Sequence, residues 1–207
     1  MAAGDFLLSR TMRPMPLTIR IGLWVWLIAA LVAGRQLWLV PLLGPALQGM
    51  LFGLTGIVLL LYFQIRTLRS WIDGLDLRSL VFFHATRFIG FYFLLLYQRG
   101  ELPYAFAVPG GWGDIFVAAG AMLICFLPLS AHARQRAIRF WNIIGLTDIL
   151  LVLFTGARLG LQDSTQMRAL TYLPLSLLPT FLVPLIIAIH VIIFLRLRHA
   201  GQTPLES

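Results

Sequence analysis

The sequence predicts an all-α membrane protein, a single polytopic bundle of six transmembrane helices with the N- and C-termini both cytoplasmic. Of its 207 residues, 59% are hydrophobic and only 12% are charged, whereas soluble domains are about 25% charged. Six apolar runs are long enough to cross a bilayer, which takes about 20 residues of helix. The basic residues gather at the ends of these runs, as membrane orientation signals do.

The six predicted spans divide the chain into three parts. The spans cover residues 19–40, 46–65, 80–97, 113–129, 140–155 and 174–195. Residues 1–18 lack the long apolar core and cleavage site of a signal peptide, and we expect a cytoplasmic or interfacial segment there. Residues 19–198 are predicted to form the transmembrane domain, and residues 199–207 a cytoplasmic tail.

The basic residues predict the orientation. All 16 are arginine, and the net charge is +8. Most of them precede the first span, follow the sixth, or lie in the loops after the second and fourth spans, which makes that side cytoplasmic. Because they lie at span ends and not in one patch, nucleic acid is not an expected partner. The exclusive use of arginine is typical of GC-rich bacterial genomes, so we predict a bacterial inner membrane.

Several function classes lack support in the sequence. Cys125 is the one cysteine, so neither an internal disulfide nor a cysteine metal site is expected. There is no Gly-rich phosphate loop, HExxH or GxSxG motif. An enzyme is therefore not favoured, and no metal site is predicted.

Three short motifs predict local structure. Residues 66–79 mix apolar and charged side chains, which predicts a stretch at the membrane interface. Asp163 and Gln166 resemble a capping box and predict a short helix. Gly49 and Gly53 are four residues apart in the second span, as in helix-packing motifs.

Polar side chains inside the predicted spans are the candidate functional residues. An intramembrane charge costs about 2.5–3.5 kcal/mol on insertion scales, so such groups usually face the bundle interior and have a partner. We expect a polar cavity formed by residues from several spans, namely His84, Arg87, Asp114, Asn142, Asp148, Thr180 and His190.

Arg87 is the centre of this prediction. It lies near the middle of the third span, three residues after His84, so the two share a helix face. Asp148 is the carboxylate nearest to Arg87 in depth, and Asp114 is reachable if Arg87 extends outward; the sequence leaves both pairings open. Asp114 follows "PGGWG" and is also predicted to cap the fourth span.

The sixth span has an unusual pattern of prolines. Pro179 and Pro184 would each free a carbonyl one turn earlier, on Leu175 and Thr180. A kinked helix with freed carbonyls is typical of cavity-lining helices in transporters. A proline-bent packing helix fits the pattern as well.

His84 and His190 also allow a cofactor hypothesis. Their predicted depths are similar and they lie on different helices. Two neutral imidazoles so placed could ligate the iron of one haem b. The alternative is that both are hydrogen-bonded structural groups without any cofactor.

One pattern resembles a known group of proteins. The order R-x-x-G-F … G-x-L-P-x-x-F-A-x-P-G-G-x-G-D, from Arg87 to Asp114, is followed by "WNIIGLTDILL" and "LPTFLVPLIIAIH". It resembles a family of small uncharacterised bacterial multi-pass membrane proteins. The resemblance implies a shared framework but no activity, and the residues it includes are Arg87, Pro109, Gly113, Asp114, Asn142, Asp148 and His190.

Together these features favour an integral inner-membrane protein with a buried polar cluster, acting as a small-solute or proton-coupled carrier. The main alternative is a non-catalytic subunit that stabilises a larger membrane complex. A haem b electron-transfer protein is the second alternative. The expected partners are the lipid bilayer and either further copies of the chain or other membrane subunits.

Overall fold

The computed structural model describes residues 14–200, with side chains through Arg198. Within this range the chain is all-α, which confirms the predicted fold class. Residues 1–13 and 201–207, most of the two predicted terminal segments, lie outside the described residues. The eight α-helices, with the short 3₁₀ and π segments between them, are α1 (Leu17–Arg35), η2 (Val40–Leu42), α2 (Pro45–Gln64), α3 (Arg66–Gly74), α4 (Leu77–Phe82), η3 (Phe83–Ile89), α5 (Gly90–Gln98), α6 (Tyr104–Phe126), α7 (Ala131–Gln162), η4 (Ser164–Thr171), η5 (Leu178–Leu182) and α8 (Val183–Ala200).

Six helical stretches are long and apolar enough to span a membrane, as predicted. They are Leu17–Arg35, Pro45–Gln64, Leu77–Gln98, Tyr104–Phe126, Ala131–Gln162 and Leu178–Arg198. Two of them are interrupted. The third consists of α4, the 3₁₀ segment η3 and α5, and the sixth begins with the π-helical segment η5 before α8.

The predicted start of the fourth span was wrong. We expected a loop through "PGGWG", but α6 begins at Tyr104 and includes Pro109. Asp114 therefore lies inside the helix and does not cap it. The glycines serve close packing instead, since a Cβ at Gly111 would lie 2.9 Å from the carbonyl oxygen of Gly90. Composition alone cannot distinguish a flexible glycine from one required by a neighbouring helix.

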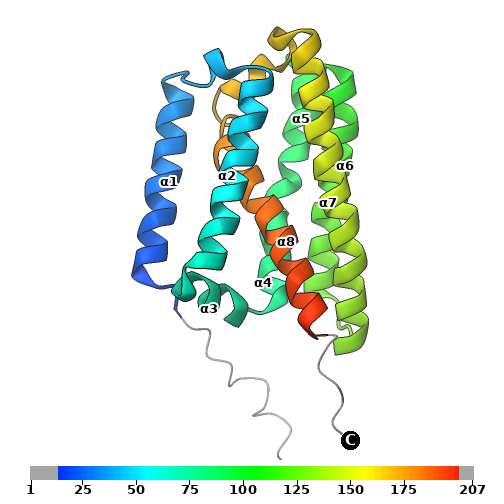
Figure 1. Cartoon of the computed structure of the whole chain (residues 1–207). Coiled ribbons are helices and arrows are strands. Elements are labelled where there is room, and N and C mark those ends of the chain that lie inside the picture. The colour runs from blue at the N-terminus through cyan, green and yellow to red at the C-terminus, as the bar shows by residue number, and fades with distance from the viewer. Residues whose placement is uncertain (1–13, 201–207) are drawn as a thin grey trace, which may run out of the picture.

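The helices form one bundle around α8 (Figure 1). α8 crosses the bundle diagonally, with α2 against it on one side and α7 on the other. α5, α6 and α7 pack together, and α1 stands at the opposite edge. The buried apolar side chains form two clusters, one around Phe93 and Leu153 and one around Val81 and Ile193.

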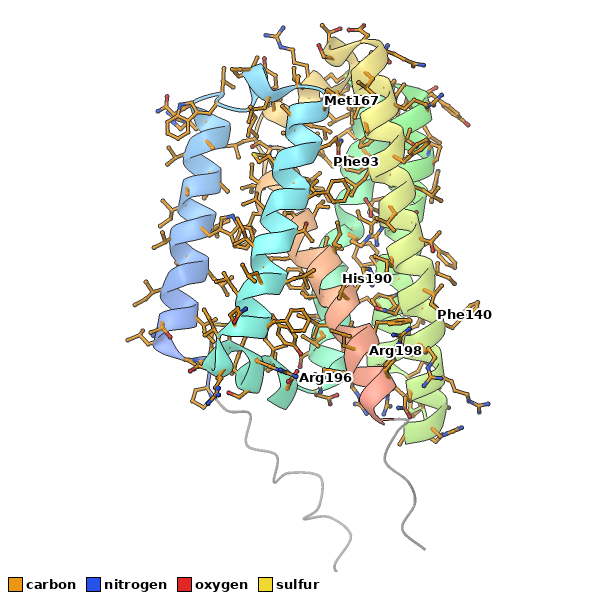
Figure 2. All side chains as sticks on the ribbon, viewed as in Figure 1. Phe93, Phe140, Met167, His190, Arg196 and Arg198 are labelled. Atoms are coloured by element: carbon orange, nitrogen blue, oxygen red, sulfur yellow. The ribbon has the colours of Figure 1, made fainter. Side chains whose placement is uncertain are left out.

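The polar candidates lie between these two apolar clusters. Figure 2 shows His190 below Phe93 and above Arg196 and Arg198, which lie near the end where α8 finishes. Charged residues of α3 and the α3–α4 connection gather at this end, and we call it the arginine-rich end. The polar groups thus form a layer with hydrocarbon packing on both sides.

The two predicted connecting segments form short helices. In α3, Arg66 and Arg69 are exposed, whereas Leu68, Trp71 and Ile72 are half-buried against the bundle. At the other end, the Asp163 carboxylate accepts hydrogen bonds from the Thr165 hydroxyl at 2.6 Å and backbone N–H at 2.9 Å, which caps η4. Both bonds stabilise the ionised carboxylate and so hold the pKa of Asp163 below its usual value. The bond from the Thr165 hydroxyl has the larger effect, and the bond from its backbone N–H the next.

Gly49 and Gly53 do not pack against another helix of the chain. A Cβ at either position would meet no atom within 4 Å. Both lie on the exposed side of α2. Packing of this motif against another helix is therefore not seen within residues 14–200, and its role in helix packing stays a prediction.

The orientation in the membrane remains a prediction that single-cysteine labelling can check. In a Cys125→Ser background, Ser70→Cys on α3 is expected to react with a membrane-impermeant thiol reagent only after the cells are opened. Gln162→Cys, at the opposite end, is expected to react in intact cells, because the arginine-rich end should be cytoplasmic. The reverse labelling pattern would contradict this orientation.

Candidate functional site

Arg87 is buried at the middle of the third span and contacts groups from two other helices. Its side chain is 1% exposed. Nε donates to Oδ1 of Asp114 on α6 at 2.6 Å, and Nη2 donates to Oδ2 of Asp148 on α7. Nη1 donates to the carbonyl oxygen of Gly145, also on α7, at 2.9 Å. Both pairings that the sequence left open are therefore present, and a backbone carbonyl completes the set.

The 3₁₀ segment η3 aligns His84 with Arg87. Side chains three residues apart eclipse one another in a 3₁₀-helix, so these two residues project to the same side of the third span. Both are buried; Arg87 binds groups of α6 and α7, and His84 lies against Trp141 of α7 and His190 of α8. The local tightening of the helix therefore directs the two polar side chains into the bundle interior.

Small residues let the neighbouring helices come close enough for these contacts. Gly90 of the third span lies against Gly111 and Asp114 of α6, where its missing Cβ would be 2.9 Å from the Asp114 Cβ. Gly113 lies against the Asp148 carboxylate, and a Cβ there would occupy the space of that carboxylate. The glycines of "PGGWG" are therefore part of the ion-pair site.

α7 contributes polar groups along one side. Asn142 donates from Nδ2 to the carbonyl oxygen of His190 at 3.1 Å, and its Oδ1 lies 2.8 Å from Nδ1 of the same histidine. Since Oδ1 is an acceptor, His190 carries its proton on Nδ1. Gly145 lies one turn further along, and its missing Cβ would be 2.7 Å from Cε1 of His190.

His84 and His190 meet in the bundle interior. Their ring centroids are 4.2 Å apart with an angle of 32° between the planes, and Trp141 lies beside both at 4.9 and 5.5 Å. Among the described residues, neither nitrogen of His84 nor Nε2 of His190 has a hydrogen-bond partner. Buried polar nitrogens are almost always hydrogen-bonded, so this pair has an unused capacity to bind a water molecule or a proton.

The histidine pair does not fit the haem hypothesis. An iron between two imidazoles holds each ring nitrogen about 2 Å away, which separates the ring centres by roughly 6 Å. The observed centroid distance of 4.2 Å leaves no room for a macrocycle between the rings. Within residues 14–200, no group of three or more His, Cys, Asp or Glu side chains could hold a metal ion.

Thr180 lies apart from the Arg87 contacts and belongs to the distorted start of the sixth span. Its hydroxyl donates to the carbonyl oxygen of Ser176 at 2.6 Å. The Thr180 carbonyl, which Pro184 was expected to free, accepts the indole N–H of Trp26 at 2.9 Å. The other predicted free carbonyl, on Leu175, accepts the backbone N–H of Leu178. Both carbonyls thus have partners, whereas the buried hydroxyl of Ser176 has none among the described residues.

A small cavity of about 50 Å³ adjoins the ion pairs. Arg87 and Asp114 line it, and it extends away from the arginine-rich end toward Gln48 and Leu170. Oε1 of Gln48 is buried and has no partner among the described residues. The cavity has room for one or two water molecules, given about 30 Å³ for each in the liquid.

The sequence analysis missed two residues of this site. Gly145 accepts a hydrogen bond from Arg87 through its backbone, which no side-chain search can find. Trp141 packs on both histidines and donates from Nε1 to the carbonyl oxygen of Val117 at 2.9 Å. The spacing of Asn142, Gly145 and Asp148 in "WNIIGLTD" is the signal that could have indicated Gly145.

The fold and the site define a class: a multi-pass membrane protein with a buried Arg87–Asp114–Asp148 cluster between interrupted helices. The chain belongs to the family described as "Domain of unknown function (DUF8737)", which it matches over residues 45–198. The match begins at α2 and includes every residue of the cluster, while α1 lies outside it. No curated protein and no solved structure matches the chain.

The packing around the cluster predicts opposite effects for two glycine substitutions. Gly113→Ala should destabilise the protein, because the added Cβ takes the place of the Asp148 carboxylate. Gly49→Ala, where nothing lies within 4 Å, should stabilise it by about 0.5–1 kcal/mol through helix propensity. Unfolding in mixed micelles would measure both, and a stabilised Gly113→Ala variant would argue against this packing.

The charge balance predicts a ranking of cluster variants. Arg87→Gln should lower the free energy of unfolding by about 3–5 kcal/mol, because it leaves two carboxylates buried without a cation. Asp114→Asn should cost less, since Arg87 keeps Asp148 and the Gly145 carbonyl. The same unfolding measurement checks the order, and an Asp114→Asn variant less stable than Arg87→Gln would contradict it.

Proposed function

We propose that this protein is a proton-coupled carrier of a small solute, with Arg87, Asp114 and Asp148 as the coupling site. One observation carries the proposal: two carboxylates share a single guanidinium in the middle of the bundle. With all three groups ionised the cluster has a net charge of −1, and with one proton bound it is neutral. A low-dielectric interior strongly favours the neutral cluster, so uptake or release of one proton changes its charge state.

The two carboxylates are suited to different roles. The Asp148 side chain is 20% exposed, whereas that of Asp114 is 6% exposed. Asp148 is thus the group that can exchange a proton with its surroundings, and Asp114 is the group that holds Arg87. When Asp148 is protonated, its bond to Nη2 weakens and the guanidinium can turn toward another acceptor, such as a bound solute.

The surroundings of the cluster support alternating access. The cavity beside Arg87 extends toward one end of the bundle. On the other side, the rings of His84, His190 and Trp141 pack against one another in the interior. The interrupted spans that carry Arg87 and His190 are of the kind that line sites in secondary transporters. We infer that this conformation is closed toward the arginine-rich end.

The expected location is the bacterial inner membrane, with the arginine-rich end in the cytoplasm. The histidine pair would then close the cytoplasmic side and carry protons between the cluster and that side. Both ring nitrogens of His84 and Nε2 of His190 have no hydrogen-bond partner among the described residues, so they are the groups that could take part in such a path. The alternative of a subunit in a larger complex predicts stoichiometric partners on purification; a homogeneous single species would count against it.

Proton flux through proteoliposomes tests the proposal. Liposomes containing a pH-sensitive dye would receive the purified protein, and a potassium diffusion potential would drive protons inward. Because the proton is proposed to move with a solute, small carboxylates that the Arg87 guanidinium could bind would be added outside one at a time. Wild-type protein is expected to acidify the lumen, and Asp148→Asn to fall to the level of empty liposomes because it cannot bind the proton. Asp163→Asn is the matched control, since Asp163 lies outside the cluster and is exposed.

Two results would contradict the carrier function. One is wild-type flux no greater than that of empty liposomes. The other is equal flux through wild type and a folded Asp148→Asn variant. The second result would show that any proton path avoids the cluster.

A further inference from the structure

The edge helix α1 stands partly away from the bundle. Of its 19 residues, only Ala30 and Gly34 are buried. Trp26 connects it to the sixth span through the bond to Thr180 and through a ring contact with Phe181 at 4.8 Å. Toward the arginine-rich end, side chains do not fill the space beside α1. A hollow of about 740 Å³ lies there, lined by residues of α1, α2, α3, the start of α4 and α8.

We call this hollow the α1–α3 groove; its sides are apolar. Leu23 and Trp26 of α1 face it from one side, and Ala188 and Ile192 of α8 from another. At Gly22 a Cβ would meet no atom within 4 Å, so the groove is open there. Its volume is in the range of sites that hold whole ligands, about 300–1,000 Å³. In a bilayer, a hydrocarbon chain is the occupant that these walls favour.

One polar group in the groove has no partner. Trp71 of α3 lines it, and its indole Nε1 is buried without an acceptor among the described residues. A buried N–H without an acceptor is rare in native proteins. Buried tryptophans usually bond this group. The Trp71 N–H therefore needs an acceptor oxygen, and a bound molecule with a polar group at the end of its hydrocarbon chain can supply one.

The charged residues near the groove indicate whether a molecule bound there would be anionic or cationic. α3 carries its apolar residues toward the groove, while Arg66 and Arg69 on the same helix are exposed. The one acidic residue of α3, Asp73, lies 3.6 Å from Nε of Arg69 and accepts the Tyr62 hydroxyl at 2.8 Å. The surplus of positive charge at this end complements an anionic headgroup, to which each basic residue near the surface adds about 1 kcal/mol.

We propose that the α1–α3 groove binds an anionic phospholipid from the membrane leaflet at the arginine-rich end. An acyl chain lies between α1 and α8, and an ester or phosphate oxygen accepts the Trp71 N–H. The headgroup lies beside the arginines of α3. The site shares no residue with the Arg87 cluster, so it does not depend on the carrier function.

Native mass spectrometry of the purified full chain tests the site. The protein in mild detergent would be mixed with equal amounts of phosphatidylglycerol and phosphatidylcholine. Wild type should retain phosphatidylglycerol in preference. Trp71→Phe keeps an aromatic ring, although a smaller one, and removes the N–H, so retention should fall roughly two- to tenfold, as for the loss of one hydrogen bond. Trp24→Phe, on the exposed side of α1, is the matched control and should bind as wild type does.

Further variants test separately the binding of the acyl chain in the groove and the contribution of the arginine charge to headgroup preference. Gly22→Trp should fill the groove and abolish retention, whereas Gly53→Trp, equally open but on the exposed side of α2, should not. Arg66→Gln should reduce the preference for phosphatidylglycerol about fivefold while leaving phosphatidylcholine unaffected.

Three results would overturn the proposal. The first is equal retention of the two lipids by wild type. The second is wild-type retention by Trp71→Phe or Gly22→Trp. The third is a lipid-free dimer that Gly22→Trp dissociates, because a second copy of the chain would then cover the groove.

Discussion

The structure depends on the need to satisfy a guanidinium in the middle of the membrane. Arg87 cannot remain in hydrocarbon without partners, and it binds Asp114, Asp148 and the Gly145 carbonyl. These groups come from α6 and α7, so one side chain of the third span fixes the positions of two further helices. Unlike apolar packing, which tolerates sliding, the hydrogen bonds of a planar guanidinium require a defined direction for each partner.

The close packing around Arg87 follows from the same requirement. A carboxylate is a short side chain, so α6 and α7 must approach the third span closely for Asp114 and Asp148 to reach. Gly90, Gly111 and Gly113 permit that approach, because each lies where a Cβ would overlap a neighbour. The glycine-rich sequence that looks like a flexible loop is therefore closely packed against the third span and α7.

Some polar groups of the site are fully hydrogen-bonded, and others have no partner among the described residues. Every N–H-bearing nitrogen of Arg87 has an acceptor, yet the neighbouring His84 and His190 retain three nitrogens without partners in the described part of the chain. The first set fixes the bundle, and the second leaves polar capacity in its interior. The 3₁₀ and π segments lie in the same two spans that carry these residues.

Much of the site could be predicted from the sequence. A charged or imidazole side chain within a long apolar run is conspicuous, and its cost in hydrocarbon implies a buried position. His84, Arg87, Asp114, Asn142 and His190 are indeed buried, and Asp148 is half-buried against Arg87. The sequence did not distinguish between the two aspartates, because helix depth gives one coordinate only and the rotation of each helix is unknown. In the structure, Arg87 pairs with both aspartates.

The sequence by itself determined the all-α class, the six spans and the identity of the polar residues between them, because hydrophobicity and charge are properties of the chain alone. Tertiary structure decided which groups meet. Three contacts depend on the distances between helices: the ring contact of His84 with His190, the bond from Arg87 to the Gly145 carbonyl, and the bond from the Trp26 indole to the Thr180 carbonyl. Those distances are set by glycines whose neighbours lie far away in the sequence, so no local pattern contains them.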